Sequence, residues 1–305
     1  MDCYARSRAA RAVWDEAERI CREQLGFSLL EVVRQSPREL TVRGRQLVHP
    51  KGVLYLTQFT QVAMAVLAVA QVAELRERGA LSPDAWFCGH SVGEYAALGA
   101  VAGVVPLEAL VTVVYERGLT MDRLVPRDET GASVFAMCVA RPNVAGLDEA
   151  GLLALVAQVR ADTGLAIEVV NFNVRGRQYS VTGHSRGLDA LNVALETRSR
   201  GSRVAPLVRV PGVDVPFHST LLRDGVGAFR ETLRRVLPTD VAPERLTGRY
   251  LPNLVAIPFE VTRAFATAVH AASDSPVVSA LLDAWEATPG AERARALLIA
   301  LLAYQ

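Results

Sequence analysis

A serine between two glycines is the first feature of this sequence that could do chemistry. Residues 89–93 read GHSVG, a GxSxG pentapeptide, after a short run that predicts a strand and before an alanine-rich helix over 94–102. In a strand–turn–helix of this kind Ser91 lies on a strained turn, and side chains at the two glycine positions would clash. Its hydroxyl stands at the positive end of the helix, where the Val92 N–H can help to bind an oxyanion. The alternative is an ordinary glycine turn with a capping serine.

A serine nucleophile needs a base, and the sequence holds five histidines. His218 lies in the short apolar segment 215–219, which contains a proline and presents an imidazole at a defined edge. His90 adjoins the nucleophile, so its side chain should diverge from the hydroxyl. No motif surrounds the other three, His49, His184 and His270. By spacing alone, His218 is the best candidate of the five.

Arg117 continues the apolar stripe of a predicted helix, three residues after Val114. A guanidinium directed into the interior is costly unless an anion meets it. It could hold a substrate carboxylate through two parallel hydrogen bonds. A snorkelling arginine near the helix C-terminus explains the pattern equally well.

Composition limits the class of protein that carries these residues. Half of the 305 residues are hydrophobic and 6% are aromatic, which suits an α/β protein. Lys plus Arg (33) nearly balances Asp plus Glu (32) without long runs of one sign, so neither nucleic acid nor an anionic membrane is expected as a partner. The longest apolar stretch, 54–73, is interrupted by polar residues and predicts a buried helix rather than a membrane span.

The four cysteines are widely spread and form no CxxC pair. Reduced core thiols in a cytoplasmic protein are therefore expected, and neither a metal site nor a disulfide framework.

The elements that must position the candidates change character along the chain. Helices are expected in the first and last thirds: 14–25 ended by Gly26, 59–78, 106–116, 222–236, 260–272, 277–287 and 291–304. The middle third alternates as β-α-β-β-α-β, with strands over 134–140, 166–173, 178–183 and 204–210 and helices over 152–161 and 188–197. That is the split βαβ pattern. We predict a ferredoxin-like subdomain at 129–204, inserted into a larger α/β subdomain whose two parts are 1–128 and 205–305.

Several motifs together resemble a known family. GHSVGEY at 89–95, YERG at 115–118 with Met121, and PFHS at 216–219 resemble the malonyl-CoA:acyl carrier protein transacylases. A narrower resemblance, to the malonyl/palmitoyl transferase domain of actinobacterial and fungal-β type I fatty acid synthases, rests on LTQFTQ at 56–61, VPRDE at 125–129, VNFN at 170–173 and GRYLPNL at 248–254. It covers nearly the whole chain. The implied fold is α/β and malonyl-transacylase-like: an α/β-hydrolase-like large subdomain with an inserted ferredoxin-like small subdomain.

The resemblance also implies roles for residues. Ser91 would be acylated by acyl-CoA with His218 as its base, and Arg117 would hold the malonyl carboxylate. Gln305 would orient the histidine through its backbone carbonyl. Phe217 resembles the residue that favours malonyl over α-branched units. The implied substrate-binding residues besides Arg117 are Val92, Phe217, Asn173 and Gln61.

The reaction implied is ping-pong transfer, with no metal or redox cofactor. Malonyl-CoA and long-chain acyl-CoA would be substrates, and the phosphopantetheine arm of acyl carrier protein the acceptor, among the other fatty acid synthase domains. The family's Gly-Gln-Gly strand and its last apolar strand are not found here, so we expect an internal piece of a larger polypeptide. The rivals are a serine hydrolase or thioesterase, with Asp214 as the acid nearest His218 in sequence, and a non-catalytic scaffold.

Overall fold

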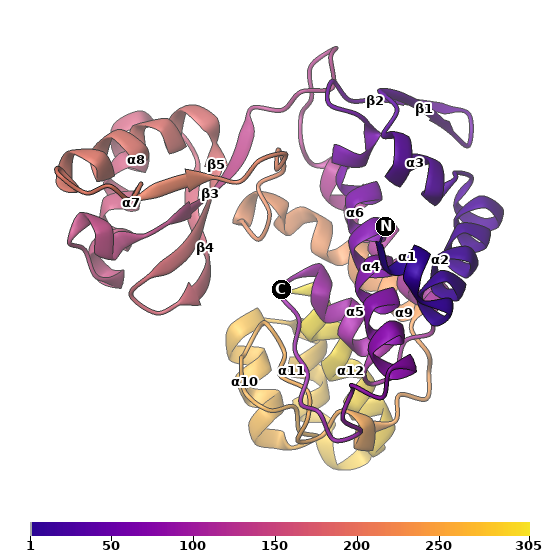
Figure 1. Cartoon of the computed structure of the whole chain (residues 1–305). Coiled ribbons are helices and arrows are strands. Elements are labelled where there is room, and N and C mark those ends of the chain that lie inside the picture. The colour runs from indigo at the N-terminus through magenta and orange to yellow at the C-terminus, as the bar shows by residue number, and fades with distance from the viewer. Residues whose placement is uncertain (1) are drawn as a thin grey trace. The chain divides into compact units, whose positions relative to one another are not determined.

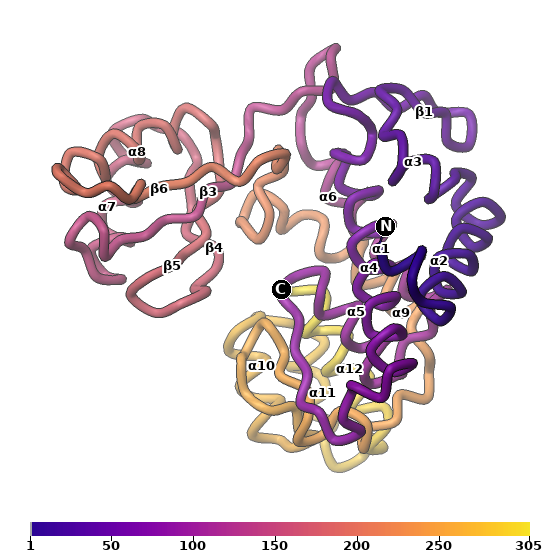
Figure 2. The backbone as a smooth tube through the Cα atoms, in the orientation of Figure 1, coloured from indigo at the N-terminus to yellow at the C-terminus, as the bar shows by residue number. Residues whose placement is uncertain are grey.

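The computed structural model describes residues 2–305, which form two compact units. The first unit runs to Thr120 and resumes from Val226 to Gln305, and the second is Met121–Gly225. The chain passes from the first unit to the second near the end of α6 (Leu107–Arg123) and returns at α9 (Val226–Val236) (Figure 2). The second unit extends beyond the predicted insert, 129–204, on both sides.

The first unit begins with short helices set by local capping. Ser7 caps α2 by accepting a hydrogen bond from the Ala10 N–H, and a single π-helical turn follows α2. Gly26 ends this turn in the left-handed region (φ 82°), as its position in the sequence predicts. The helices of this segment are α1 (Asp2–Arg6), α2 (Arg8–Ile20) and α3 (Leu29–Gln35).

Helix α4 (Thr57–Glu77) packs against both α2 and α5 (Val92–Ala100) (Figure 1). It buries Phe59 and Val66 completely, but Met64, Leu67 and Leu75 are exposed. The expectation of a buried helix therefore holds for one side of α4 only. By length and composition α4 is the one helix among residues 2–305 that could cross a membrane, and its buried side belongs to the core of the first unit.

The strands of the first unit differ from the prediction in two places. The hairpin of β1 (Glu39–Val42) and β2 (Arg45–Val48) is not predicted, although Arg43 and Gly44 both have positive φ, as a two-residue hairpin turn requires. Conversely, residues 84–88, which are the short run predicted as a strand before the pentapeptide, make no strand. They form a single parallel β-bridge, between Phe87 and Tyr250, and the pairing does not extend to the residues on either side.

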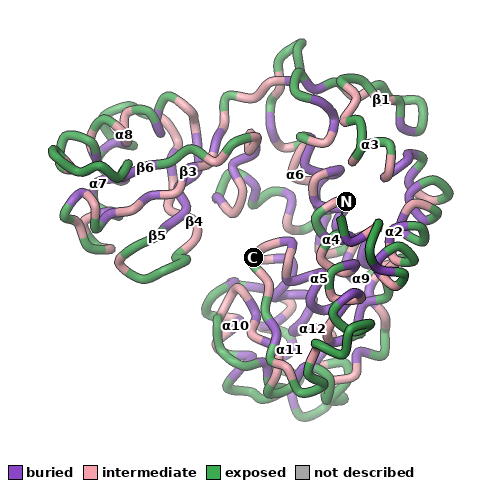
Figure 3. The backbone as a smooth tube through the Cα atoms, viewed as in Figure 1, coloured by how far each residue is buried: buried purple, intermediate pink, exposed green. Residues whose placement is uncertain are grey.

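The C-terminal helices complete the core of the first unit. They are α10 (Arg263–Ser273), α11 (Pro276–Asp283) and α12 (Gly290–Ala303), each beginning or ending within a few residues of its predicted bounds. Figure 3 shows that the tube through α5 and α12 is largely buried. Of the four free cysteines, Cys3, Cys21 and Cys138 are buried as expected, whereas Cys88 is exposed.

The second unit is a four-stranded antiparallel sheet with two helices (Figure 1). The strand order is β4-β5-β3-β6, and the chain order β-α-β-β-α-β confirms the split βαβ pattern. Its core includes Leu152 and Leu188 from the two helices and Tyr179 from the sheet. The elements are β3 (Phe135–Ala140), α7 (Glu149–Thr163), β4 (Ile167–Val174), β5 (Gln178–His184), α8 (Ser185–Arg198) and β6 (Leu207–Arg209), the last shorter than predicted.

Candidate active site

Ser91 lies directly before α5 in a strained conformation, with φ 52° and ψ −117°. A Cβ at Gly89 would overlap the carbonyl group of Gly93, so the turn requires glycine at this position, as predicted. The same prediction is wrong for Gly93, because a Cβ there would meet no heavy atom within 4 Å. The sharp turn therefore depends on the first glycine of the pentapeptide.

The backbone N–H groups at the start of α5 lie next to Ser91, and two of them already have acceptors. The Gly93 N–H donates to the His90 carbonyl at 3.0 Å, and the Glu94 N–H donates to the Ser91 carbonyl at 3.0 Å. Val92 is the first residue of the helix, so its N–H is one of those that have no acceptor within the helix. A developing oxyanion near the Ser91 hydroxyl would lie at the positive end of the helix dipole.

The Arg117 side chain points into the interior next to the serine and is only 3% exposed, so it does not snorkel to water. It donates to the Ser91 Oγ at 3.4 Å, to Gln61 Oε1 at 2.8 Å and to Gln305 Oε1 at 3.2 Å. Its guanidinium also lies 5.3 Å from the centre of the Tyr95 ring. Three predicted site residues from distant parts of the chain thus gather around one cation.

Close helix packing makes this arrangement possible. Gln61 lies on the first turns of α4, where its amide also donates to Thr57 Oγ1 at 2.9 Å. A Cβ at Gly118, the residue after Arg117, would lie 2.6 Å from the backbone nitrogen of Gln58. Glycine at this position therefore lets α6 approach the start of α4 closely enough for Arg117 to reach Gln61.

A buried carboxylate, Glu94, connects this cluster to the chain near residue 250. It accepts hydrogen bonds from the Tyr250 hydroxyl, from the Asn253 N–H at 3.0 Å and from the Gln305 side-chain amide. Burial raises the pKa of Glu94 to about 7, while the hydrogen bonds from Tyr250 and Asn253 and the Arg117 charge oppose the rise. Because Gln305 bonds both Arg117 and Glu94, its side-chain amide bridges the cation and the carboxylate.

Sequence reasoning gave no role to Glu94, Tyr250 or Asn253. Asn253 reaches the nucleophile turn directly: its Oδ1 accepts from the Ser91 N–H at 3.2 Å, and its Nδ2 donates to the Gly89 carbonyl. The sequence did contain a hint, because all three residues lie in GHSVGEY or GRYLPNL, two of the motifs on which the family resemblance rests. Only the fold shows that these two motifs meet.

The predicted residues His218, Phe217 and Asn173 belong to the second unit. His218 is half-buried and has φ 63°, so it and Ser91 are two of the six non-glycine residues with positive φ among residues 2–305. Strained backbone concentrates at functional sites. Phe217 packs against a small cluster formed by Val125, Val215 and Leu222. Asn173 is exposed and donates to Ser180 Oγ at 3.1 Å.

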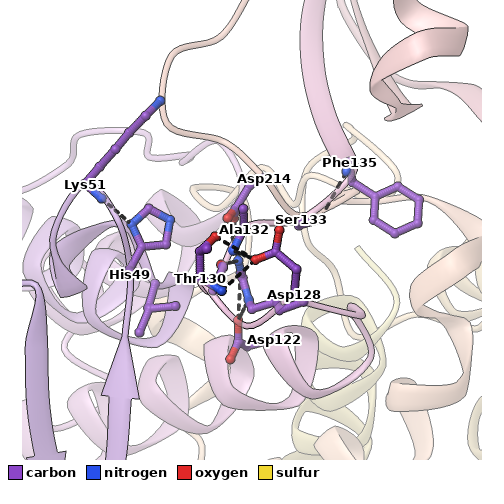
Figure 4. Close-up of polar contacts among 12 residues, drawn as sticks. His49, Lys51, Asp122, Asp128, Thr130, Ala132, Ser133, Phe135 and Asp214 are labelled. Carbon is purple, nitrogen blue, oxygen red and sulfur yellow. Dashed lines mark hydrogen bonds and ion pairs between the residues drawn. The ribbon is translucent and has the colours of Figure 1, made fainter.

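Asp214, the acid considered for the hydrolase alternative, forms a two-point ion pair with Arg127 at 2.5 and 3.1 Å. Arg127 also pairs with Asp122 at 2.8 Å, and Figure 4 shows both aspartates in this network. Burial lowers the pKa of Arg127, but its bonds to Asp214 and Asp122 outweigh burial and raise that pKa overall. Asp214 therefore has a strong structural interaction with a cation.

Two of the remaining histidines, His49 and His90, differ in burial. His49 is buried, stacks on Tyr55 at 5.6 Å and accepts a hydrogen bond from the Lys51 N–H (Figure 4). His90 is exposed. Within residues 2–305, no group of three or more His, Cys, Asp or Glu side chains is arranged to hold a metal ion.

Comparison with known proteins identifies the family. The model of the acyl transferase domain matches residues 1–205. The chain belongs to the acyl transferase domain family. It is 36% identical, over its whole length, to fatty acid synthase 2 of Mycosarcoma maydis, of which it covers 10%. The chain spans 10–18% of the length of the first curated relatives that it matches, which are fungal fatty acid synthases.

Solved structures confirm the fold. An acyl-carrier-protein S-malonyltransferase from Burkholderia pseudomallei is 26% identical, with a TM-score of 0.64 over 94% of this chain and 81% of that one. A malonyl-transacylase solved in complex with a type II polyketide synthase acyl-carrier protein is 24% identical, with a TM-score of 0.64 over 88% of this chain and 73% of that one. The predicted α/β fold of the malonyl-transacylase kind is therefore confirmed.

Proposed function

We propose that this acyl transferase domain moves malonyl groups from CoA to the phosphopantetheine thiol of acyl carrier protein through an acyl-Ser91 intermediate. The observation that carries the proposal is the buried Arg117 guanidinium beside the Ser91 hydroxyl. A malonyl thioester has a carbonyl for the serine and, one methylene away, a carboxylate for the arginine. Arg117 donates to neutral oxygens of Gln61, Ser91 and Gln305, and a substrate carboxylate would accept stronger hydrogen bonds from it than these do.

In each step of the proposed reaction one proton is transferred and one bond to the acyl carbon forms or breaks. His218 takes the Ser91 proton while Oγ bonds to the thioester carbonyl carbon, and the Val92 N–H stabilises the oxyanion. The carbon–sulfur bond then breaks, and CoA leaves as a thiol with the proton from His218. The carrier-protein thiol reverses these steps and takes the acyl group from Ser91.

Further parts of the proposal follow from the hydrogen bonds of Arg117 and from the resemblance of the motifs to the family. Gln61 and Gln305 would hold Arg117 in place, and Phe217 and Asn173 would contact substrate from the second unit. The same serine would return long-chain acyl groups from carrier protein to CoA, within a cytoplasmic fatty acid synthase. The fungal synthases and the carrier-protein complex among the similar proteins support this setting.

Mass spectrometry of the chain after incubation with malonyl-CoA tests the proposal. We expect one malonyl group on the peptide that contains Ser91, none in Ser91→Ala, and normal labelling in Ser202→Ala, which changes an exposed serine of the second unit. Adding carrier protein should discharge the malonyl group onto its thiol.

The outcomes separate the alternatives. Release of free malonate in place of malonyl carrier protein would indicate a hydrolase. No adduct on the unmodified chain, or labelling that survives Ser91→Ala, would refute the proposal.

A further inference from the structure

The backbone at Ser91 adopts a conformation that it would not keep by itself. A serine with φ 52° and ψ −117° lies outside the regions that side-chain-bearing residues favour. Such a conformation persists only where the surrounding structure fixes it. The question is therefore which contacts hold the turn.

The side chain of Asn253 holds it from both sides. Its Oδ1 accepts from the Ser91 N–H at 3.2 Å, and its Nδ2 donates to the Gly89 carbonyl. These two backbone groups flank His90, so one planar amide closes a bridge across the turn. Only an amide side chain offers a donor and an acceptor side by side in this way.

Asn253 is itself held by the helix that the turn begins. Its backbone N–H donates to Glu94 Oε1 at 3.0 Å, and the Tyr250 hydroxyl donates to the same oxygen. Tyr250 is fully buried and stacks on Phe87, with ring centres 5.4 Å apart. The hydrogen bonds thus form a closed circuit from Ser91 through Asn253 to Glu94 and back along α5.

We propose that Asn253 is a positioning residue, which fixes the turn so that the Ser91 hydroxyl faces the acyl carbonyl. This inference rests on the proposed function for the identity of the acyl substrate, whereas the hydrogen bonds that hold the Ser91 turn do not depend on it. The hydrogen bonds of Asn253 go to the backbone on either side of His90, so Asn253 acts through the position of Ser91. Glu94 also accepts from the Asn253 backbone N–H, and substitutions of the Asn253 side chain leave this backbone bond in place.

Displacement of a reacting group by about 1 Å costs on the order of 100-fold in rate. We therefore expect Asn253→Ala to slow acylation of Ser91 by about 10- to 100-fold. The dissociation constant for malonyl-CoA should change by less than about twofold, because Arg117 and Gln61 are untouched. Asn253→Asp should be at least as slow, because its carboxylate has no donor for the Gly89 carbonyl and carries a charge against it.

The experiment measures two single-turnover rates on the folded 305-residue chain. One is acylation by malonyl-CoA, and the other is labelling of Ser91 by a fluorophosphonate, which needs no CoA recognition. Circular dichroism gives the folded fraction of each variant. Asn192→Ala is the matched control, because Asn192 also donates through its amide, to Glu196 on an exposed helix face.

Loss of both rates in fully folded Asn253→Ala and Asn253→Asp, with unchanged malonyl-CoA binding, would support the positioning role. Rates equal to those of Asn192→Ala would overturn it, as would losses that match the unfolded fraction. If the unmodified chain reacts with the fluorophosphonate but not with malonyl-CoA, the proposed function fails. The fluorophosphonate rates of the variants then still decide the role of Asn253.

Discussion

Replacing Arg117 with alanine should remove the preference for a substrate that carries a carboxylate. The guanidinium is 3% exposed and lies within 3.4 Å of the Ser91 Oγ, so an acyl group on that serine would place its carboxylate in a poorly hydrated site. A hydrogen bond to a charged group contributes about 1.5–3 kcal/mol there. Since about 1.4 kcal/mol is a factor of ten, malonyl transfer should fall by about 10- to 150-fold.

The hydrogen bonds that Arg117 makes within the protein should increase the loss of malonyl transfer in Arg117→Ala further. Three of its five N–H donors bond to Gln61, Ser91 and Gln305. Arg117→Ala also removes the hydrogen bond to Gln61 Oε1, which costs further stability of the site. That second cost applies to every acyl group, whereas the carboxylate pairing applies to malonyl alone.

The assay is therefore a ratio: kcat/KM for malonyl-CoA over kcat/KM for acetyl-CoA, with the same carrier protein as acceptor. Arg117→Ala should lower this ratio by at least about tenfold. Arg249→Ala is the control, because Arg249 donates to the Pro83 and Ala85 carbonyls and its loss should affect both substrates equally. Equal losses for malonyl and acetyl in Arg117→Ala would show that the arginine is structural and would refute the carboxylate role.

Two further predictions concern stability. Because burial raises the pKa of Glu94 from 4.5 to about 7, the folded state binds its proton more tightly, so the free energy of unfolding should fall by ~3 kcal/mol as pH rises through that window. Glu94→Gln should remove this fall in urea titrations, and a pH dependence identical to the unmodified chain would contradict it. Gly118→Ala should lower the free energy of unfolding by about 1–3 kcal/mol, because its Cβ would meet the Gln58 backbone. Gly227→Ala, whose Cβ meets nothing within 4 Å, should be neutral or stabilising, and equal effects of the two changes on the melting temperature would refute the packing argument.

Features that depend on short-range pattern could be predicted from the sequence. The spacing of hydrophobic residues was enough to predict the β-α-β-β-α-β order of the second unit. Buried positions recur every second residue in a strand and about every 3.6 residues in a helix, so the two kinds of element can be told apart. The pentapeptide was enough to place Ser91 on a sharp turn before a helix. The inward direction of Arg117 followed from its position on the stripe of α6, although a snorkelling side chain fitted that stripe equally well.

Features that depend on which segments meet were decided by the tertiary structure. Residues 84–88 are apolar enough for a strand, but a strand needs a neighbour along its length, and the structure supplies one bridge. Gly93 resembles Gly89 in the pentapeptide, yet only Gly89 has backbone packed where a side chain would lie.

The same reason explains the site. Gln61, Arg117 and Gln305 are far apart in sequence, and no local rule relates their side chains. The hydrogen bonds of Asn253 to the Ser91 turn connect residues 162 positions apart. Burial, which gives Glu94 its raised pKa and Arg117 its need for an anion, arises when helices from both ends of the chain pack together. The local sequence was therefore enough to predict Ser91 as the nucleophile. The side chains that surround it and make it specific come together only in the folded chain.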